Sequence, residues 1–225
     1  VNIQLASVIA IFNIILFAFC FSNYAFYEHE QYITTAIPQR IGFYLHYVSL
    51  FAAIYSGYQL YKINKGKTIF ELFNKTIFIW ITAFFVIYIA SAELMLHGLV
   101  ISNSPVTMHD IQSSLLYKEY KTDLPYIRSQ ISYDFIDDVR TQITKTGFPI
   151  LWGILAFVFL ITGIKKQNKN LRIIALTLLG ITILKLFLFD IRNVSETGKI
   201  IAFILLGILI LIISFVYQKI KVLVL

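Results

Sequence analysis

The chain has 225 residues, of which 58% are hydrophobic and only 14% are charged, and its formal net charge is +7. A soluble domain normally contains about 25% charged residues, so this chain has too few polar side chains to cover a surface that faces water. The composition excludes a soluble globular protein and predicts an integral membrane protein. We expect no nucleic-acid partner, because such binding needs a basic, solvated patch interleaved with aromatics, and the sequence has none.

Six long apolar segments follow one another along the chain. A bilayer core about 30 Å thick is crossed by a helix of about 20 apolar residues. The segments that meet this requirement are residues 1–21, 41–61, 77–101, 148–164, 171–190 and 200–217. The sequence therefore predicts an all-α bundle of six membrane spans, with residues 1–225 forming a single transmembrane domain in contact with the lipid bilayer.

The chain begins with Val1 and not with Met. We therefore expect it to be the carboxyl-terminal part of a longer membrane protein. Its partners would then be further transmembrane helices of that longer chain, or another protein of the cell envelope.

Lys and Arg are unevenly distributed between the two sides of this bundle. Ten basic residues and one acid, Glu71, fall between spans two and three, between spans four and five, and in the carboxyl-terminal tail. The tight turn after span four contributes Lys165, Lys166 and Lys169 to this group. On the other side, eight basic residues are offset by ten acids. Since basic loops stay in the cytoplasm, both termini of this multi-pass protein are predicted to be cytoplasmic.

Residues 102–147 form a polar connection of 46 residues on the outer side. Helix-like pieces at 109–120 and 126–143 each follow a proline, which is typical of a helix start. In the second piece, apolar residues recur at helical spacing. They are Ile127, Ile131, Phe135, Ile136 and Val139. The pieces are amphipathic, so we expect this outer loop to lie on the membrane surface or to cap the bundle.

Span five carries a lysine, Lys185, among Leu, Ile and Phe residues. An ionisable residue inside a span costs about 3 kcal/mol or more and usually faces protein or a water-filled cavity. Side chains lean toward the N-terminus of their helix, so Lys185 leans away from the nearer, outer interface. We expect it to face a partner in the protein, and snorkelling to the interface is the alternative.

Span three supplies the expected partner of Lys185. Glu93 and His97 are four residues apart, so they share one helical face, and both lie in the outer third of their span. Glu93 with Lys185 is either a structural ion pair that holds spans three and five in register or part of a working site.

Span two adds His46, which stands on a face of small residues that favours close helix packing. These small residues are Gly42, Ser49, Ala53 and Gly57. We therefore predict that His46 points at protein and not at lipid. Together with two charged residues at the outer end of span five, the candidate polar site consists of Glu93, His97, Lys185, Asp190, His46 and Arg192.

Motifs for metal or nucleophilic chemistry are absent from the sequence. There is no H-E-x-x-H, no C-x-x-C and no paired Asp motif, so we expect no metal. There is no G-x-S-x-G for a serine nucleophile and no Gly-rich phosphate loop, so we expect no cofactor.

The last third of the chain carries a series of recurring features. They are Trp152, Gly163, Leu171 with Arg172, Lys185 through Asp190, Phe203 with Gly207, and Tyr217-Gln218-Lys219. In these features, residues 148–221 resemble the carboxyl end of a bacterial family of predicted polytopic membrane proteins, catalogued as domain of unknown function 2339. The resemblance implies a helical membrane fold and a multi-pass protein of the bacterial inner membrane, and it implies no reaction.

Three classes of function remain open from the sequence. The first is a transport or translocation component of the cell envelope, in which the candidate polar site lines a path from the outer face. The second is a membrane scaffold or assembly subunit in which the same charges are structural. The third is a membrane enzyme that acts on a lipid-linked envelope substrate, with Glu93 or His97 as general base and Lys185 or Arg192 binding an anionic head group.

Overall fold

The computed structural model describes residues 3–35, 41–66, 75–102, 105–120 and 123–186, and part of the stretch from 196 to 214. Every regular element of this described part is a helix, which confirms the all-α prediction. Within it, three helical runs are long and apolar enough to cross a membrane, namely Ile3–Thr35, Lys75–Ile101 and Leu124–Lys165. The count of six spans and the side of the termini stay predictions. The chain divides into two compact units, each described below by itself.

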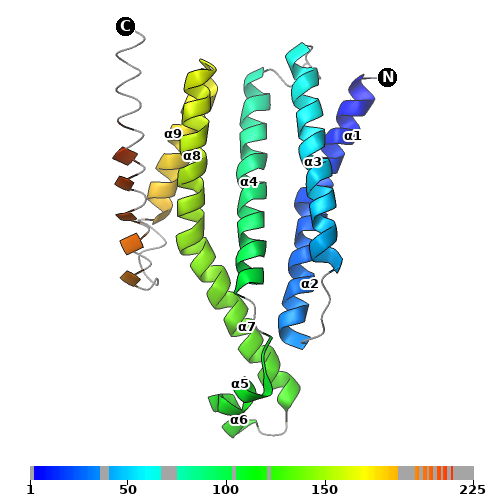
Figure 1. Cartoon of the computed structure of the whole chain (residues 1–225), viewed down its shortest axis with the longest axis vertical. Coiled ribbons are helices and arrows are strands. Elements are labelled where there is room, and N and C mark those ends of the chain that lie inside the picture. The colour runs from blue at the N-terminus through cyan, green and yellow to red at the C-terminus, as the bar shows by residue number, and fades with distance from the viewer. Residues whose placement is uncertain are drawn as a thin grey trace. The chain divides into compact units, whose positions relative to one another are not determined.

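Unit 1 comprises Val1–Leu72 and Met95–Thr141. Its first helical run consists of α1 (Ile3–Leu16), the π-helix η1 (Phe17–Phe21) and α2 (Ser22–Thr35). The run packs along α3 (Ile41–Gly66), as Figure 1 shows. Asn13 donates a hydrogen bond of 3.0 Å to the Ser56 hydroxyl, which joins α1 to α3. The sequence placed the end of the first span at residue 21, and the helix in fact continues for fourteen residues more, to Thr35.

Glu28 determines where α3 begins. Its carboxylate accepts hydrogen bonds from the backbone N–H groups of Gly42, at 3.0 Å, and Phe43, at 2.9 Å. The first N–H groups of a helix have no partner within the helix, and their partial positive charge favours an anion. A Cβ at Gly42 would lie 2.7 Å from the Glu28 Oε2 atom, so this close approach requires glycine.

The polar connection of unit 1 folds into three helices, α5 (Met108–Ser113), α6 (Leu115–Glu119) and α7 (Leu124–Gln142). Helix α5 starts with a capping box in which Thr107 and Asp110 bond each other's backbone N–H groups. Val106, Ile111 and Ile127 form a small buried core beneath these helices. In α7, Ile136 and Val139 are buried as well. The predicted helices of the loop and the buried apolar face of the second piece are therefore confirmed.

Unit 2 comprises Phe73–Leu94 and Gln142–Leu225. It contains the first part of α4 (Lys75–Ile101), the π-helix η2 (Ile143–Gly147), α8 (Phe148–Lys165) and α9 (Lys169–Lys185). Helices α8 and α9 form a hairpin that lies side by side in Figure 1. The core of the hairpin is made of Ala156, Leu160, Ala175, Leu178, Leu179 and Leu186.

The turn of this hairpin follows a Schellman motif, in which the backbone N–H groups just past a helix bond back to its last carbonyls. The N–H of Asn168 donates to the Gly163 carbonyl at 2.7 Å, and that of Gln167 donates to Ile164 at 3.0 Å. Gln167 takes the left-handed conformation with φ of 49°. The Asn168 side chain then caps α9 by accepting from Asn170 and Leu171. The tight turn expected after span four is therefore present.

Helices α7, η2 and α8 form one continuous helical run, Leu124–Lys165. The sequence had separated this run into an outer amphipathic piece, 126–143, and a span at 148–164. The two are joined because η2 widens the helix just before Pro149, whose missing N–H would otherwise interrupt it.

Candidate functional site

A cluster of aromatic and histidine side chains lies in unit 1 between α3 and the second half of α4. The Tyr47 hydroxyl oxygen is 2.6 Å from Nε2 of His97. The ring centroids of His46 and Tyr47 are 4.1 Å apart, and those of His46 and His97 are 6.2 Å apart. The fold therefore brings together two of the residues that the sequence nominated, His46 and His97. The Tyr47 hydroxyl is hydrogen-bonded to His97, and the Tyr47 ring packs at a tilt against that of His46.

The position of His46 follows from the face on which it lies. Its side chain is only 2% exposed, which confirms that it points at protein. Its Nδ1 atom lies within hydrogen-bonding distance of the Phe43 carbonyl, one turn earlier. The Phe43 ring itself is edge-on to both Tyr47 and His97, with centroids 5.5 and 5.9 Å away. Phe43 thus packs against the cluster, and the same residue is anchored by Glu28 through its backbone N–H.

The bond between Tyr47 and His97 is suited to both protonation states of the imidazole. When Nε2 carries no proton, the Tyr47 hydroxyl donates to it. When Nε2 is protonated, its N–H donates to the hydroxyl oxygen. Tyr47 and His97 can therefore share a proton in either arrangement.

Lys185 belongs to unit 2, where its ammonium group donates a hydrogen bond of 2.7 Å to the backbone carbonyl of Thr144. The expectation that Lys185 faces a partner in the protein is therefore confirmed, and the partner seen is a carbonyl. Glu93 is half-buried on α4, and its ion pair with Lys185 stays a prediction. Asp190 and Arg192 lie outside the described residues, so a single site containing all six candidates also stays a prediction.

The backbone of η2 explains why Thr144 needs a side-chain donor. In an α-helix the Thr144 carbonyl would accept from the N–H of Phe148, but that N–H donates to Ile143 instead. In a π-helix the carbonyl would accept from residue 149, which is a proline without an N–H. Lys185 supplies the donor that the helix lacks. Its presence in an apolar span is therefore accounted for by Pro149, in the neighbouring helix.

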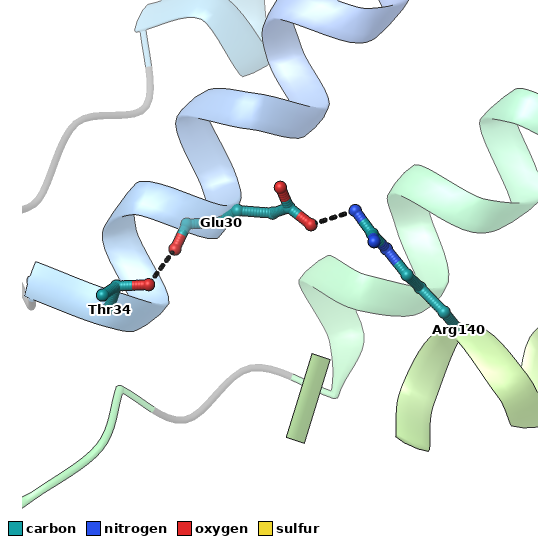
Figure 2. Close-up of polar contacts among 3 residues, drawn as sticks. All are labelled: Glu30, Thr34 and Arg140. Atoms are coloured by element: carbon teal, nitrogen blue, oxygen red, sulfur yellow. Dashed lines mark hydrogen bonds and ion pairs between the residues drawn. The ribbon is translucent and has the colours of Figure 1, made fainter. Parts of the chain in front are cut away.

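A second polar contact in unit 1 was not predicted as a pair. Arg140 on α7 forms an ion pair with Glu30 on α2, and Figure 2 shows these two side chains pointing toward each other. The Thr34 hydroxyl donates to the Glu30 carbonyl at 2.9 Å, which fixes the last turn of α2. The Arg140 guanidinium also lies 4.8 Å above the Phe26 ring, an arrangement that adds a cation–π attraction.

Sequence reasoning missed Tyr47, Glu28 and Thr144 for different reasons. Tyr47 is one of many tyrosines in its span and carries no distinguishing signal. Glu28 precedes α3 by more than a dozen residues, so its capping role depends on the turn between the helices. The Thr144 carbonyl is a backbone atom, and the only signal for it is the proline five residues later.

Comparison with known proteins identifies the family of this chain. The family model described as Predicted membrane protein (DUF2339) matches residues 3–220. The match confirms the resemblance seen in residues 148–221 and extends it over nearly the whole chain. No curated protein and no solved structure matches the chain.

Proposed function

We propose that this chain, which belongs to the DUF2339 family of predicted membrane proteins, is a transport or translocation component of the bacterial cell envelope with an outer-facing polar site. The observation that carries the proposal is the hydrogen bond between Tyr47 and His97 beside the buried His46. Ionisable side chains within membrane helices are costly, and they commonly form proton relays in pumps and transporters.

The proposed topology is six spans in the inner membrane, with both termini in the cytoplasm. Helix α3 is included as a span although it is less apolar than the others. Its exposed tyrosines support this, with Tyr44 near one end and Tyr58 and Tyr61 near the other. At 1.5 Å per residue they are about 21–26 Å apart, which suits tyrosines at the two interfaces of a bilayer.

In the proposed mechanism, a proton enters from the outer side and is received by the imidazole of His97. Tyr47 accepts or donates the shared proton, and the neighbouring His46 provides a second imidazole further along the cluster. Phe43 and the helix packing around it exclude bulk water, so that the proton moves between side chains. Coupling of this movement to a substrate would give transport.

Proton flux into proteoliposomes tests this proposal. The purified protein is reconstituted with a pH-sensitive dye inside, and a membrane potential is imposed with a potassium ionophore. We expect dye acidification above that of empty liposomes, a loss of it in His97→Gln, and a reduction in Tyr47→Phe. The control is His109→Gln, because His109 is exposed in the outer loop. Equal flux in wild type and His97→Gln, or none above empty liposomes, would refute the relay.

An assembly or scaffold role is the second candidate, and two contacts favour it. The Lys185 ammonium binds a backbone carbonyl, and Glu30 is paired with Arg140, so these charges can serve to hold helices together. In a scaffold, substitutions in the histidine cluster would lower stability and leave proton flux unchanged.

A further inference from the structure

Three helix ends meet at one end of unit 2, and each carries positive charge. Helix α4 begins at Lys75, α8 ends at Lys165, and α9 begins at Lys169. Lys166 lies in the turn between α8 and α9, and Arg172 lies in the first turn of α9. The Lys75, Lys165 and Lys169 side chains are exposed. We call these five residues the basic cluster.

Two contacts hold the basic cluster together. The Asn170 side chain donates a hydrogen bond of 3.0 Å to the Thr76 hydroxyl, which brings the starts of α4 and α9 together. Lys75 and Lys169 each precede one of these two bonded residues in the sequence. On the other side, a Cβ at Gly163 would lie 3.0 Å from the Arg172 backbone nitrogen. The glycine lets the end of α8 approach the start of α9 this closely. The backbone positions of the five charged residues are therefore held by contacts between the helix ends.

Carboxylates are rare in the sequence around the basic cluster, where Glu71 precedes Lys75 by four residues and lies outside the described residues. Residues 72–92 and 139–189 contain neither Asp nor Glu. Like charges held at adjacent helix ends repel one another, so an anion bound beside the basic cluster would stabilise it. The N-terminus of α9 is not the attracting group, because Asn168 already accepts from its first N–H groups.

Exposed apolar side chains begin directly beside the charges. Ile77 and Trp80 are 43% and 41% exposed on α4, and Ile173 and Leu176 are 42% and 48% exposed on α9. A surface with cations at the end and apolar side chains along the helices matches a phospholipid, whose phosphate is anionic and whose acyl chains are apolar. A free phosphate would match only the first of these two features.

We infer that the basic cluster is a binding site for the head group of an anionic phospholipid, with the acyl chains lying along α4 and α9. The lysine ammonium groups and the Arg172 guanidinium bind the phosphate oxygens. Trp80 lies at the level of the interface, where indole rings are favoured. The site belongs to unit 2 and the histidine cluster belongs to unit 1, and lipid binding at the basic cluster requires no transport activity.

Native mass spectrometry of the detergent-solubilised full chain tests this inference. The protein is titrated with phosphatidylglycerol and, separately, with phosphatidylcholine of the same acyl chains. We expect wild type to retain phosphatidylglycerol preferentially. Lys165→Gln with Lys169→Gln should bind it about 30-fold more weakly, from the attraction that two basic residues exert on an anionic lipid. Lys165→Arg with Lys169→Arg keeps the charge and should keep the affinity.

The matched control is Lys118→Gln with Arg128→Gln, which removes the same charge from unit 1 and should leave lipid retention unchanged. The helical content of each variant, measured by circular dichroism, separates a lost site from a lost fold. Three results would overturn the inference: equal retention of the two lipids, equal weakening in the control variant, or displacement of the lipid by inorganic phosphate at the same concentration, which would indicate a free-phosphate site.

Discussion

Replacing Lys185 by methionine tests the account of the π-helix. The change removes the donor to Thr144, whose carbonyl has neither Phe148 nor Pro149 as an alternative partner. A hydrogen bond from a charged donor contributes about 1.5–3 kcal/mol, and an unsatisfied carbonyl away from water adds a similar penalty when the donor is lost. Because Lys185 and Thr144 are half-buried, we expect Lys185→Met to lower the free energy of unfolding by about 2 kcal/mol.

A double-mutant cycle with Pro149 makes this expectation specific. Pro149→Ala restores a backbone N–H that can reach the Thr144 carbonyl, so Lys185→Met should cost about 1 kcal/mol less in that background. Unfolding is followed by circular dichroism in mixed micelles titrated with dodecyl sulfate. Lys185→Arg keeps a donor and is the control. If Lys185→Met stays within about 0.5 kcal/mol of wild type, or if the two changes are additive, the explanation of Lys185 by Pro149 is wrong.

Three further predictions concern the helix ends. Gly42→Ala should lower the free energy of unfolding by about 2 kcal/mol, because its Cβ displaces the Glu28 carboxylate. The control is Gly180→Ala, whose added Cβ has no atom within 4 Å, and it should raise the free energy of unfolding by up to about 1 kcal/mol in the same titration. Gln167→Gly should stabilise the chain by about 1 kcal/mol by relieving the φ of 49°, and a loss of stability would contradict the Schellman turn. Hydrogen bonding from Thr107 lowers the pKa of Asp110. The α5 cap should therefore be fully formed above the unfolded pKa and should fray as pH falls through the lower, folded pKa. The amide-exchange protection of α5, relative to the intrinsic exchange rate at each pH, checks this, and protection that does not change with pH would count against it.

The membrane class, the helical fold and the buried face of His46 could all be predicted, because they depend on composition and on local periodicity. The tight turn at Lys165–Lys169 was also predictable, because a short polar segment between two apolar helices has to reverse the direction of the chain within a few residues. The helix predicted at 126–143 was also recognised by its spacing of apolar residues. Its fusion with α8 was missed, because the π-helix that joins them has no periodicity of its own.

The contacts that a side chain makes with a neighbouring helix were harder to predict than the face of its own helix on which it lies. The sequence predicted that His46 and His97 lie in the outer half of their spans, yet it could not show that Tyr47 contacts both of them. A shift of α3 against α4 by one residue would bring a different side chain to His97. For Lys185 the sequence suggested a carboxylate partner and gave no sign of the Thr144 carbonyl, since charges are visible in a sequence and spare carbonyls are not. The role of Glu93 stays a prediction.

Accessibility of position 97 from the outer side is the measurement that tests the central claim most directly. In a Cys20→Ser background, His97→Cys is treated with a membrane-impermeant maleimide, added to intact cells or to inverted membrane vesicles. An outer-facing polar site predicts that the thiol is modified in intact cells and is protected in inverted vesicles. Modification only in inverted vesicles, or in neither preparation, would contradict an outer-facing site at the histidine cluster.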